Sequence, residues 1–269
     1  MTQGERRLLN IVVCIKQVPG TTHVQIDPET NTLVRTGIEN IVNPFDMYAI
    51  EEGLRIRERY GGKVTALSMG PPQAEAALRE AISMGVDGAA FVCDRAVAGS
   101  DTWATSYVLA KAIQKIGAYD LIVCGKQAID GDTAQVGPGI ADRLGIPFAA
   151  WVKRIEHIVD GTIRVQRMMD DGYEVIDMPL PALITVVKEI NEPRLPSLRG
   201  KMAAKKAQIS AWSAEDIEAE PDRVGLQGSP TQVIQVFRPE RKGRGEILDG
   251  DVGESVSKLV HGLRRMAVL

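Results

Sequence analysis

The chain has few aromatic residues and almost no net charge. Only 4% of its 269 residues are Phe, Trp or Tyr, and 32 Lys and Arg residues stand against 35 Asp and Glu residues, a net charge of -3. General nucleic-acid binding needs a basic face, and single-strand binding also needs aromatic side chains on which bases stack. The composition therefore argues against nucleic acid as a partner.

Long apolar runs and cysteine pairs are also missing. No stretch approaches the roughly 18 consecutive apolar residues that span a bilayer, and the N-terminus has no signal-peptide pattern. The three cysteines (Cys14, Cys93 and Cys124) form no C-x-x-C pair and end apolar runs, so we expect packed thiols in strands rather than redox or metal-binding ones. The three histidines lack metal-ligand spacing. We expect a soluble cytoplasmic protein without a metal.

What the first 150 residues do contain is an alternation of two periodicities. Four apolar runs have the continuity of strands covered on both faces: residues 10–18, 63–69, 88–93 and 120–124. Four segments read as helices, most of them with apolar residues at helical spacing: 43–60, 74–82, 109–116 and 133–144. Strands separated by helices form βαβ units with parallel strands. The predicted fold is therefore α/β, a doubly wound, mostly parallel sheet of the nucleotide-binding, Rossmann-like kind.

The second half of the chain has a different texture. Short strand-like runs at 152–158, 162–168 and 173–176 are parted by Asp-Gly turns, which predicts an antiparallel extension of the sheet, and an apolar run at 183–187 predicts one more strand. After residue 190 the chain is rich in proline, glycine and charge until a helix at 254–265 with an apolar stripe. Because little of the chain remains to cover that stripe, we expect the C-terminal segment to wrap around another chain.

The strongest local motif is GKQAIDGDTAQVGP, residues 125–138, which follows a predicted strand and is expected to open a helix at about Asp132. Ligands of open α/β sheets bind at this edge, helix N-termini offer N–H groups to phosphate, and glycines allow close approach. The motif matches neither common Gly-rich phosphate fingerprint. An ordinary loop with Asp132 as N-cap explains it equally well. Because Asp130 and Asp132 would repel phosphate, contacts should come from amides and from hydroxyls such as that of Thr133.

Two more helix openings are expected at the same edge. Residues 43–46, Asn-Pro-Phe-Asp, have the order of an N-cap, a proline at the first position and an acid at the third, which explains them without a ligand. Residues 100–106, SDTWATS, are rich in hydroxyls. Three openings at one edge favour a nucleotide site. We find no nucleophile–base or paired-carboxylate constellation, so we expect no catalytic side chain, and redox chemistry would come from a bound cofactor.

Five separated segments together resemble one family. VVCIKQV (12–18), the stretch from NPFD to GLRI (43–56), the 125–138 motif, 165–185 and INEPRLPSLRGKMAAKK (190–206) resemble the β subunit of electron-transfer flavoproteins. The resemblance covers the chain from about residue 10 to its end. It implies an obligate heterodimer with an α subunit that holds FAD, and exchange of electrons with an acyl-CoA dehydrogenase.

The resemblance also divides the chain. Residues 1–189 would form the nucleotide-binding domain, 190–207 the recognition loop for the partner dehydrogenase, and 208–269 an arm that packs on the α subunit. Leu198 matches the leucine that anchors the dehydrogenase. An exposed apolar side chain in a basic, proline-bearing loop is also a plausible docking anchor on physical grounds.

The resemblance implies an adenine nucleotide in this subunit. Matched residue by residue, its site would consist of Cys14, Asn43, Pro44, Phe45, Asp46, Met69, Gly125, Lys126, Gln127, Ala128, Ile129, Asp130, Gly131, Asp132, Thr133, Ala134, Gln135 and Val136. The 100–106 opening would add Asp101, Thr102 and Thr105.

The family has two subgroups, which differ in that nucleotide. The conventional subunit holds AMP and relays single electrons to a membrane-bound quinone oxidoreductase, whereas the electron-bifurcating one holds a second FAD. Asp46 stands where the conventional form commonly has Cys, residues 130–138 replace a more acidic loop, and the SDTWATS opening resembles the FAD-binding type. We therefore expect FAD.

The expected reaction follows from that cofactor. NADH would deliver a hydride, and the electrons would divide between the acyl-CoA dehydrogenase, through the α-subunit FAD, and ferredoxin or flavodoxin, or flow in reverse. Two alternatives remain open. One is a non-bifurcating relay with FAD or AMP, coupled to the membrane-bound oxidoreductase, and the other is a non-redox nucleotide-binding protein of the same fold.

Overall fold

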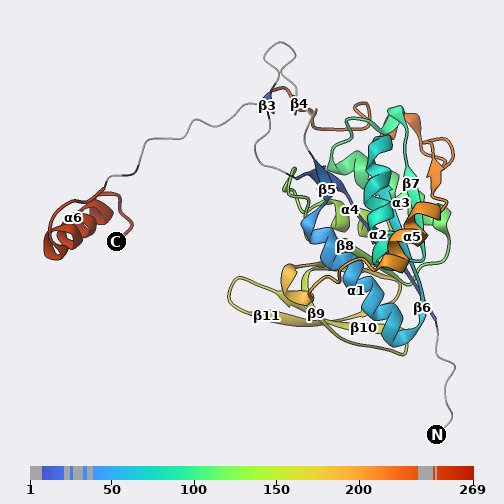
Figure 1. Ribbon diagram of the computed structural model, residues 1–269, viewed down its shortest axis with the longest axis horizontal. Helices are drawn as coiled ribbons and strands as arrows, with labels where there is room; N and C mark the ends of the chain where they lie inside the picture. The colour runs from blue at the N-terminus through green and yellow to red at the C-terminus, as the bar shows by residue number, and fades with distance from the viewer. Residues whose placement is uncertain (1–7, 21–24, 27–32, 35–38, 236–244, 246) are drawn as a thin grey trace, which may run out of the picture.

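The computed structural model describes residues 8–20, 25–26, 33–34, 39–235, 245 and 247–269. Nine strands form one sheet in the order β11-β10-β9-β12-β8-β1-β6-β7-β13 (Figure 1). Their bounds are β1 (Leu9–Cys14), β6 (Gly62–Met69), β7 (Gly88–Val92), β8 (Leu121–Gly125), β9 (Phe148–Val159), β10 (Thr162–Met168), β11 (Tyr173–Pro179), β12 (Ala182–Val186) and β13 (Ser210–Trp212). Seven strands pair in parallel, and β10 and β11 add the antiparallel extension.

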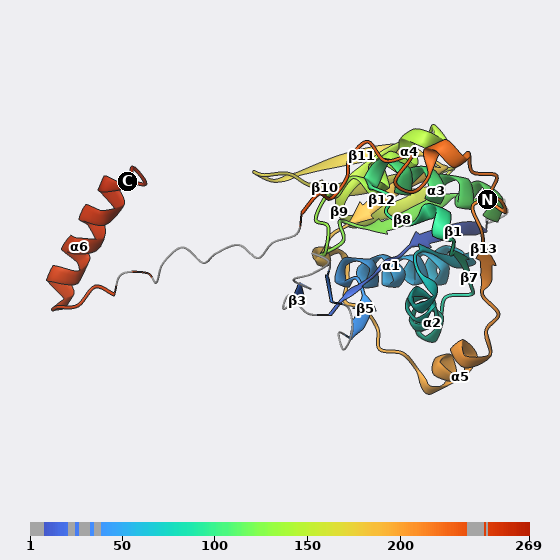
Figure 2. The ribbon, with the colours of Figure 1, turned by 90° about the horizontal axis from the view of Figure 1, so that it is seen from above.

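Helices cover both faces of this sheet (Figure 2). The α-helices of the described chain are α1 (Pro44–Tyr60), α2 (Glu75–Met84), α3 (Thr102–Ile116), α4 (Val136–Leu144), α5 (Leu198–Lys206) and α6 (Val252–Arg265). Neighbouring residues of β1 serve the two faces: Val13 packs in one core with Ile50 of α1, and Val12 in the other with Val108 of α3. The predicted doubly wound, mostly parallel α/β fold is confirmed.

Short elements complete the described chain. Strands β2 (Gln17–Pro19) and β5 (Asn40–Val42) pair with each other, as do β3 (Gln25–Ile26) and β4 (Leu33–Val34). Single 3-10 turns lie at η1 (Pro72–Ala74), η2 (Arg95–Val97), η3 (Lys188–Ile190) and η4 (Pro221–Arg223). The strand predicted over 10–18 is therefore wrong in its length. It leaves the main sheet after Cys14, and β2 then pairs with β5 instead.

Residues 190–207 contain a helix, α5, that their prolines and lysines did not predict. Ser197 caps α5 by accepting a hydrogen bond from the Gly200 N–H at 2.9 Å. The helix packs on α2, and a Cβ at Gly200 would lie 2.0 Å from the Ser83 carbonyl oxygen. Glycine therefore permits the close approach of the two helices.

The chain after residue 208 has two parts. Residues 210–212 add β13 to the edge of the sheet, and Ala214, Ile217 and Val224 are buried against the α3 side. The helix α6 stands apart in both views (Figures 1 and 2), and none of its residues is buried. Within the described residues, no helix is long and apolar enough to cross a bilayer.

Candidate functional site

The carboxyl ends of the parallel strands bring most of the predicted site residues to one edge of the sheet. Cys14 ends β1, Met69 ends β6 and Gly125 ends β8. Four helices begin at this edge: α1 is the first helix after β1, α2 follows β6, α3 follows β7 and α4 follows β8. Ligands of doubly wound proteins bind at this edge, where the strands end.

Asn43 does something other than cap α1. It occupies the N-cap position but makes no side-chain cap hydrogen bond. Its Nδ2 donates instead to the Gln127 carbonyl oxygen at 2.8 Å, and its Oδ1 accepts from the Ile129 N–H at 3.1 Å. The side chain is only 1% exposed. The capping interpretation is therefore wrong for Asn43, which fixes the loop between β8 and α4.

Asp46 ties three elements together at their ends. Its Oδ2 accepts a hydrogen bond from the Lys16 N–H at 2.7 Å, and the Gly125 amide is a further donor to the buried carboxyl. Burial raises the pKa of Asp46 to about 7, although these hydrogen bonds and that of Asn43 oppose the shift. A Cβ at Gly125 would lie 2.3 Å from the carboxyl Oδ1. Asp46 thus joins the start of α1 to the backbone that follows β1 and to the end of β8.

The loop at residues 126–135 carries backbone amides with no partner. Within the described chain, the N–H groups of Gly131, Thr133 and Ala134 donate no hydrogen bond. Asp132 and Ala134 both have positive φ, 55° each, a conformation that costs energy outside glycine and clusters at functional sites. Amides exposed by alternating backbone conformations form anion-binding concavities. The loop therefore has a backbone conformation typical of anion-binding loops, and phosphate binding at residues 125–136 stays a prediction.

The start of α4 adds to this concavity. The predicted helix start at Asp132 is wrong, because that residue has a left-handed backbone, and α4 begins at Val136. Gln135 occupies the N-cap position without a side-chain cap hydrogen bond. The first amides of α4 therefore have no side-chain cap, the arrangement in which a helix start can bind an anion.

The two carboxylates of the loop are held by other side chains. Lys16 Nζ lies 2.7 Å from Asp130 Oδ1, and the Gln127 side-chain amide donates to the Asp132 carboxylate. Asp130 therefore has its charge balanced, which lowers the repulsion expected for a phosphate. Sequence reasoning did not single out Lys16, although a lysine directly after a buried strand was the available signal.

The thiols of Cys14 and Cys124 lie side by side in paired strands. The two residues are in register between β1 and β8, and each is 7% exposed. Their hydrogen bond, together with burial, raises the pKa of Cys124. All three cysteines are free. The predicted packing of Cys14 and Cys124 in strands is confirmed.

At the start of α3, most of the polar groups already form hydrogen bonds within the chain. Asp101 Oδ1 accepts from the N–H groups of Trp103 and Ala104 at 2.9 and 3.0 Å, and its Oδ2 accepts from the Thr231 hydroxyl at 2.8 Å. Thr105 Oγ1 lies 3.5 Å from the Ser100 carbonyl oxygen, and Thr102 begins the helix. Binding of a cofactor by Asp101, Thr102 and Thr105 stays a prediction.

Sequence reasoning missed Trp151, whose ring lies beside the loop. Lys126 Nζ lies 4.5 Å from the ring centre of Trp151 and 6.0 Å from that of Phe45. Trp151 has a φ of 62°, and its N–H donates to Thr185 Oγ1 at 3.0 Å. The strained backbone places a partly exposed indole at this edge, which nothing in the local pattern indicated.

Leu198 lies away from this edge, at the first position of α5, and is 84% exposed. Leu195 and Met202 in the same segment are 89% and 63% exposed. Among the described residues no group of three His, Cys, Asp or Glu side chains is arranged to hold a metal ion.

A mostly parallel nine-stranded sheet with helices on both faces and helix starts at its carboxyl edge defines a doubly wound α/β protein. The sequence model of the electron transfer flavoprotein domain matches residues 30–217. The chain therefore belongs to the electron transfer flavoprotein family, among its β subunits.

Several curated relatives match over most of their length. The electron transfer flavoprotein subunit beta of Thermoanaerobacterium thermosaccharolyticum is 50% identical over 262 residues, 97% of this chain and 100% of the relative. The caffeyl-CoA reductase-Etf complex subunit CarD of Acetobacterium woodii is 48% identical, with 97% of this chain and 100% of the relative covered. The protein FixA of Azorhizobium caulinodans is 45% identical, with coverages of 87% and 86%.

Proposed function

We propose that this chain is the β subunit of a heterodimeric electron-transfer flavoprotein and holds FAD at the 126–135 loop. NADH is the proposed hydride donor. The electrons pass through the α-subunit FAD to an acyl-CoA dehydrogenase, and to ferredoxin or flavodoxin. The observation that carries the proposal is the set of unpaired amides at Gly131, Thr133 and Ala134, next to the uncapped start of α4.

The residues at the edge fit the pyrophosphate of such a cofactor. Two linked phosphates need several donors, and the loop amides and the first turn of α4 supply them without a side-chain cation. Asn43 holds the loop in place by two hydrogen bonds. When bound, FAD supplies the hydride and single-electron chemistry, and the chain binds and orients it.

The choice of FAD over AMP rests on the subgroup resemblance at Asp46, residues 130–138 and 100–106. Asp46 supports it indirectly, because its carboxyl is turned onto the backbone of Lys16 and Gly125 and so sets the shape of the cradle. The relay that uses AMP and a membrane-bound quinone oxidoreductase is the competing function.

Two exposed features support the proposed partners. Leu198 and its apolar neighbours form a projecting surface suited to a pocket on an acyl-CoA dehydrogenase. The helix α6 presents Val256 and Leu259, 53% and 49% exposed, on its apolar side, and we assign this side to the α subunit.

The deciding experiment is to release and quantify the nucleotides of the co-purified αβ complex. Two FAD and no AMP per heterodimer are expected, followed by reduction of one FAD by NADH. One FAD and one AMP would contradict FAD binding and leave the conventional relay. A colourless complex would point to the non-redox alternative.

A further inference from the structure

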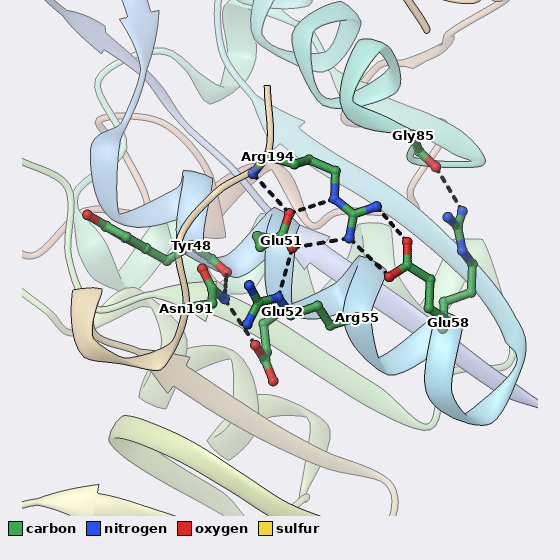
Figure 3. A network of polar contacts seen from close by, with 9 residues as sticks. Tyr48, Glu51, Glu52, Arg55, Glu58, Gly85, Asn191 and Arg194 are labelled. Atoms are coloured by element: carbon green, nitrogen blue, oxygen red, sulfur yellow. Dashed lines mark hydrogen bonds and ion pairs between the residues drawn. The ribbon is translucent and has the colours of Figure 1, made fainter. Parts of the chain in front are cut away.

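An ion-pair network fastens the segment before α5 to the outer face of α1 (Figure 3). Arg194 is at its centre. Its Nε and Nη2 donate to the two oxygens of Glu51 at 2.7 and 3.1 Å, and its Nη1 and Nη2 donate to those of Glu58 at 2.5 and 3.1 Å. One guanidinium thus makes two bidentate pairs, the geometry in which arginine binds carboxylates most strongly.

Of the two carboxylates that Arg194 binds, Glu51 is withdrawn from water, whereas Glu58 is exposed. Glu51 is 2% exposed and is also held by Arg55 Nε at 2.8 Å. Burial alone would raise the pKa of Glu51, but the hydrogen bonds from Arg194 and Arg55 outweigh it and lower the pKa. Glu51 therefore stays charged, and its pairing with Arg194 is less screened than a pair at the surface.

A second contact holds the beginning of the same segment. Asn191 Nδ2 donates to the Tyr48 carbonyl oxygen and to Glu52 Oε2, both at 3.0 Å (Figure 3). Residues 192–196 belong to no helix or strand. Their conformation therefore depends on these side-chain contacts with α1.

The far end of the segment is fastened to a different helix. Arg79 Nη1 of α2 donates to the Ala204 carbonyl oxygen at 2.5 Å. The exposed side chains of Leu195, Leu198 and Met202 lie between the two attachments. The apolar surface is thus attached to α1 at one end and to α2 at the other. Arg194 directly precedes Leu195, the first residue of this surface.

We propose that Arg194 is a positioning residue for partner docking, which holds Leu195 and Leu198 outward before the partner arrives. The inference rests on the proposed function, in which Leu198 contacts the acyl-CoA dehydrogenase. A segment free to fold onto its own domain would have to be ordered at each encounter, and that ordering weakens association. The network on α1 orders it in advance.

The helix α1 contacts both the segment that holds Leu198 and the edge of the sheet where the nucleotide is proposed to bind. Asn43 and Asp46, at the start of α1, hold the 126–135 loop and β8, and the network lies one to four turns further along the helix. A single rigid element therefore fixes the distance between the docking surface and the cradle.

The test uses the complete αβ complex as electron acceptor for an acyl-CoA dehydrogenase purified from the same organism. The variants are Arg194→Gln, Arg194→Lys and Leu198→Ala. For Arg194→Gln we expect the KM for the complex to rise about ten-fold, with kcat at saturation and nucleotide content unchanged. Arg194→Lys keeps the charge but loses the bidentate geometry, so its KM should lie between those of the wild type and Arg194→Gln.

Matched controls separate positioning from general damage. Arg57→Gln removes another arginine of α1, which pairs with Asp87 at 2.9 Å and makes no contact with the segment, and its KM should equal that of the wild type. Trypsin should cut after Arg199 and Lys201 faster in Arg194→Gln than in Arg57→Gln, because the segment is released. Equal cutting rates would overturn the inference.

The outcomes for Arg194 and Leu198 are distinguishable. If Leu198→Ala leaves the KM unchanged, the docking part of the proposed function fails. If Leu198→Ala raises the KM and Arg194→Gln does not, docking stands and the positioning role is refuted. Because Arg194 acts through its neighbours, the double variant should lose less than the product of the two single effects, and a full product would argue against the inference.

Discussion

At the scale of single residues, Asp46 is a buried acid. Its carboxyl group lies where β1 and β8 end and α1 begins. It is 6% exposed, and burial raises its pKa to about 7 from an ordinary value of 3.8. The folded chain therefore binds this proton more tightly than the unfolded chain does. By linkage, stability from this group is complete below about pH 4 and is lost as the pH rises through 7.

Asp46→Asn cannot titrate and so provides the reference. The free energy of unfolding of the wild type minus that of Asp46→Asn should fall between about pH 4 and pH 7 by about 1.4 kcal/mol per pH unit. It should be constant above about pH 8. Urea unfolding of both proteins at pH 5, 6, 7 and 8 measures this difference, and a difference independent of pH would show that Asp46 titrates normally.

The pair of Lys16 and Asp130 is a second feature of this scale. Lys16→Met should change the free energy of unfolding by less than about 1 kcal/mol, because the side chains are 49% and 32% exposed. Nucleotide affinity should fall about ten-fold, since the Asp130 carboxylate is left uncompensated beside the phosphates. Calorimetric titration of the nucleotide-free complex with FAD and with AMP measures the loss.

Removing the Asp130 carboxylate as well tests whether its uncompensated charge causes the loss of nucleotide affinity. The double variant Lys16→Met with Asp130→Asn should recover most of the affinity, because no unpaired charge remains near the ligand. If the double variant binds as weakly as Lys16→Met, then Lys16 contacts the nucleotide directly and does not act by neutralising Asp130.

At the scale of elements, β8 and α1 approach each other so closely that only glycine fits between them. A Cβ on Gly125 would lie 2.3 Å from Asp46 Oδ1 and 2.7 Å from the Phe45 carbonyl carbon. Gly125→Ala should lower the free energy of unfolding by about 1–3 kcal/mol and reduce the nucleotide content, because the start of α1 must shift. Urea unfolding and nucleotide release measure the two effects.

Gly131→Ala is the matched control from the same loop. No heavy atom lies within 4 Å of a Cβ at this position, so the free energy of unfolding should change by less than about 0.5 kcal/mol. An equal loss in both variants would mean that the loop as a whole resists substitution, and the close approach of α1 to β8 would not be the reason.

The elements of the sheet could be predicted because their signals are local. Continuous apolar runs such as that of β8, and helical stripes such as that of α3, fall within one element and need no knowledge of their neighbours. The antiparallel hairpins were also predicted, since Asp-Gly turns such as 160–161 are short-range signals. The fold class follows from these elements and their order.

The details of the site depend on contacts between distant residues, which local patterns do not contain. Asn43 has the sequence context of an N-cap, yet its partners lie 84 and 86 residues further along the chain. Aspartate tolerates a left-handed backbone, but the same conformation at Ala134 has no signal in its residue type. The three residues of β13 join the sheet only through pairing with β7, and α5 is stabilised by its packing on α2.

At the scale of the whole molecule, α6 is a helix whose apolar side is uncovered. The chain between it and the sheet includes residues outside the described part, and α6 itself buries none of its residues. Such a side is stabilised when another chain covers it. We therefore expect α6 to contribute to the affinity between the two subunits.

Leu259→Asp should weaken binding of the α subunit at least about ten-fold, because a charge would replace an apolar anchor of the interface. The stability of the sheet domain should not change. Size-exclusion chromatography over a dilution series measures the dissociation. His261→Asp adds the same charge on the polar side and should bind like the wild type, and equal weakening by both variants would show that net charge, not the apolar side, is responsible.

The path of residues 187–209, which carry the proposed docking surface between β12 and β13, also has a consequence for folding. The segment leaves the sheet after β12 and returns at its far edge as β13, and its arginine pairs with residues of α1 that lie 136 and 143 positions earlier. Contacts between residues so far apart in sequence form late, because long loops must close first. Under the proposed function, a chain with an unfinished sheet lacks the ordered docking surface, so we expect only fully folded subunits to exchange electrons with the dehydrogenase.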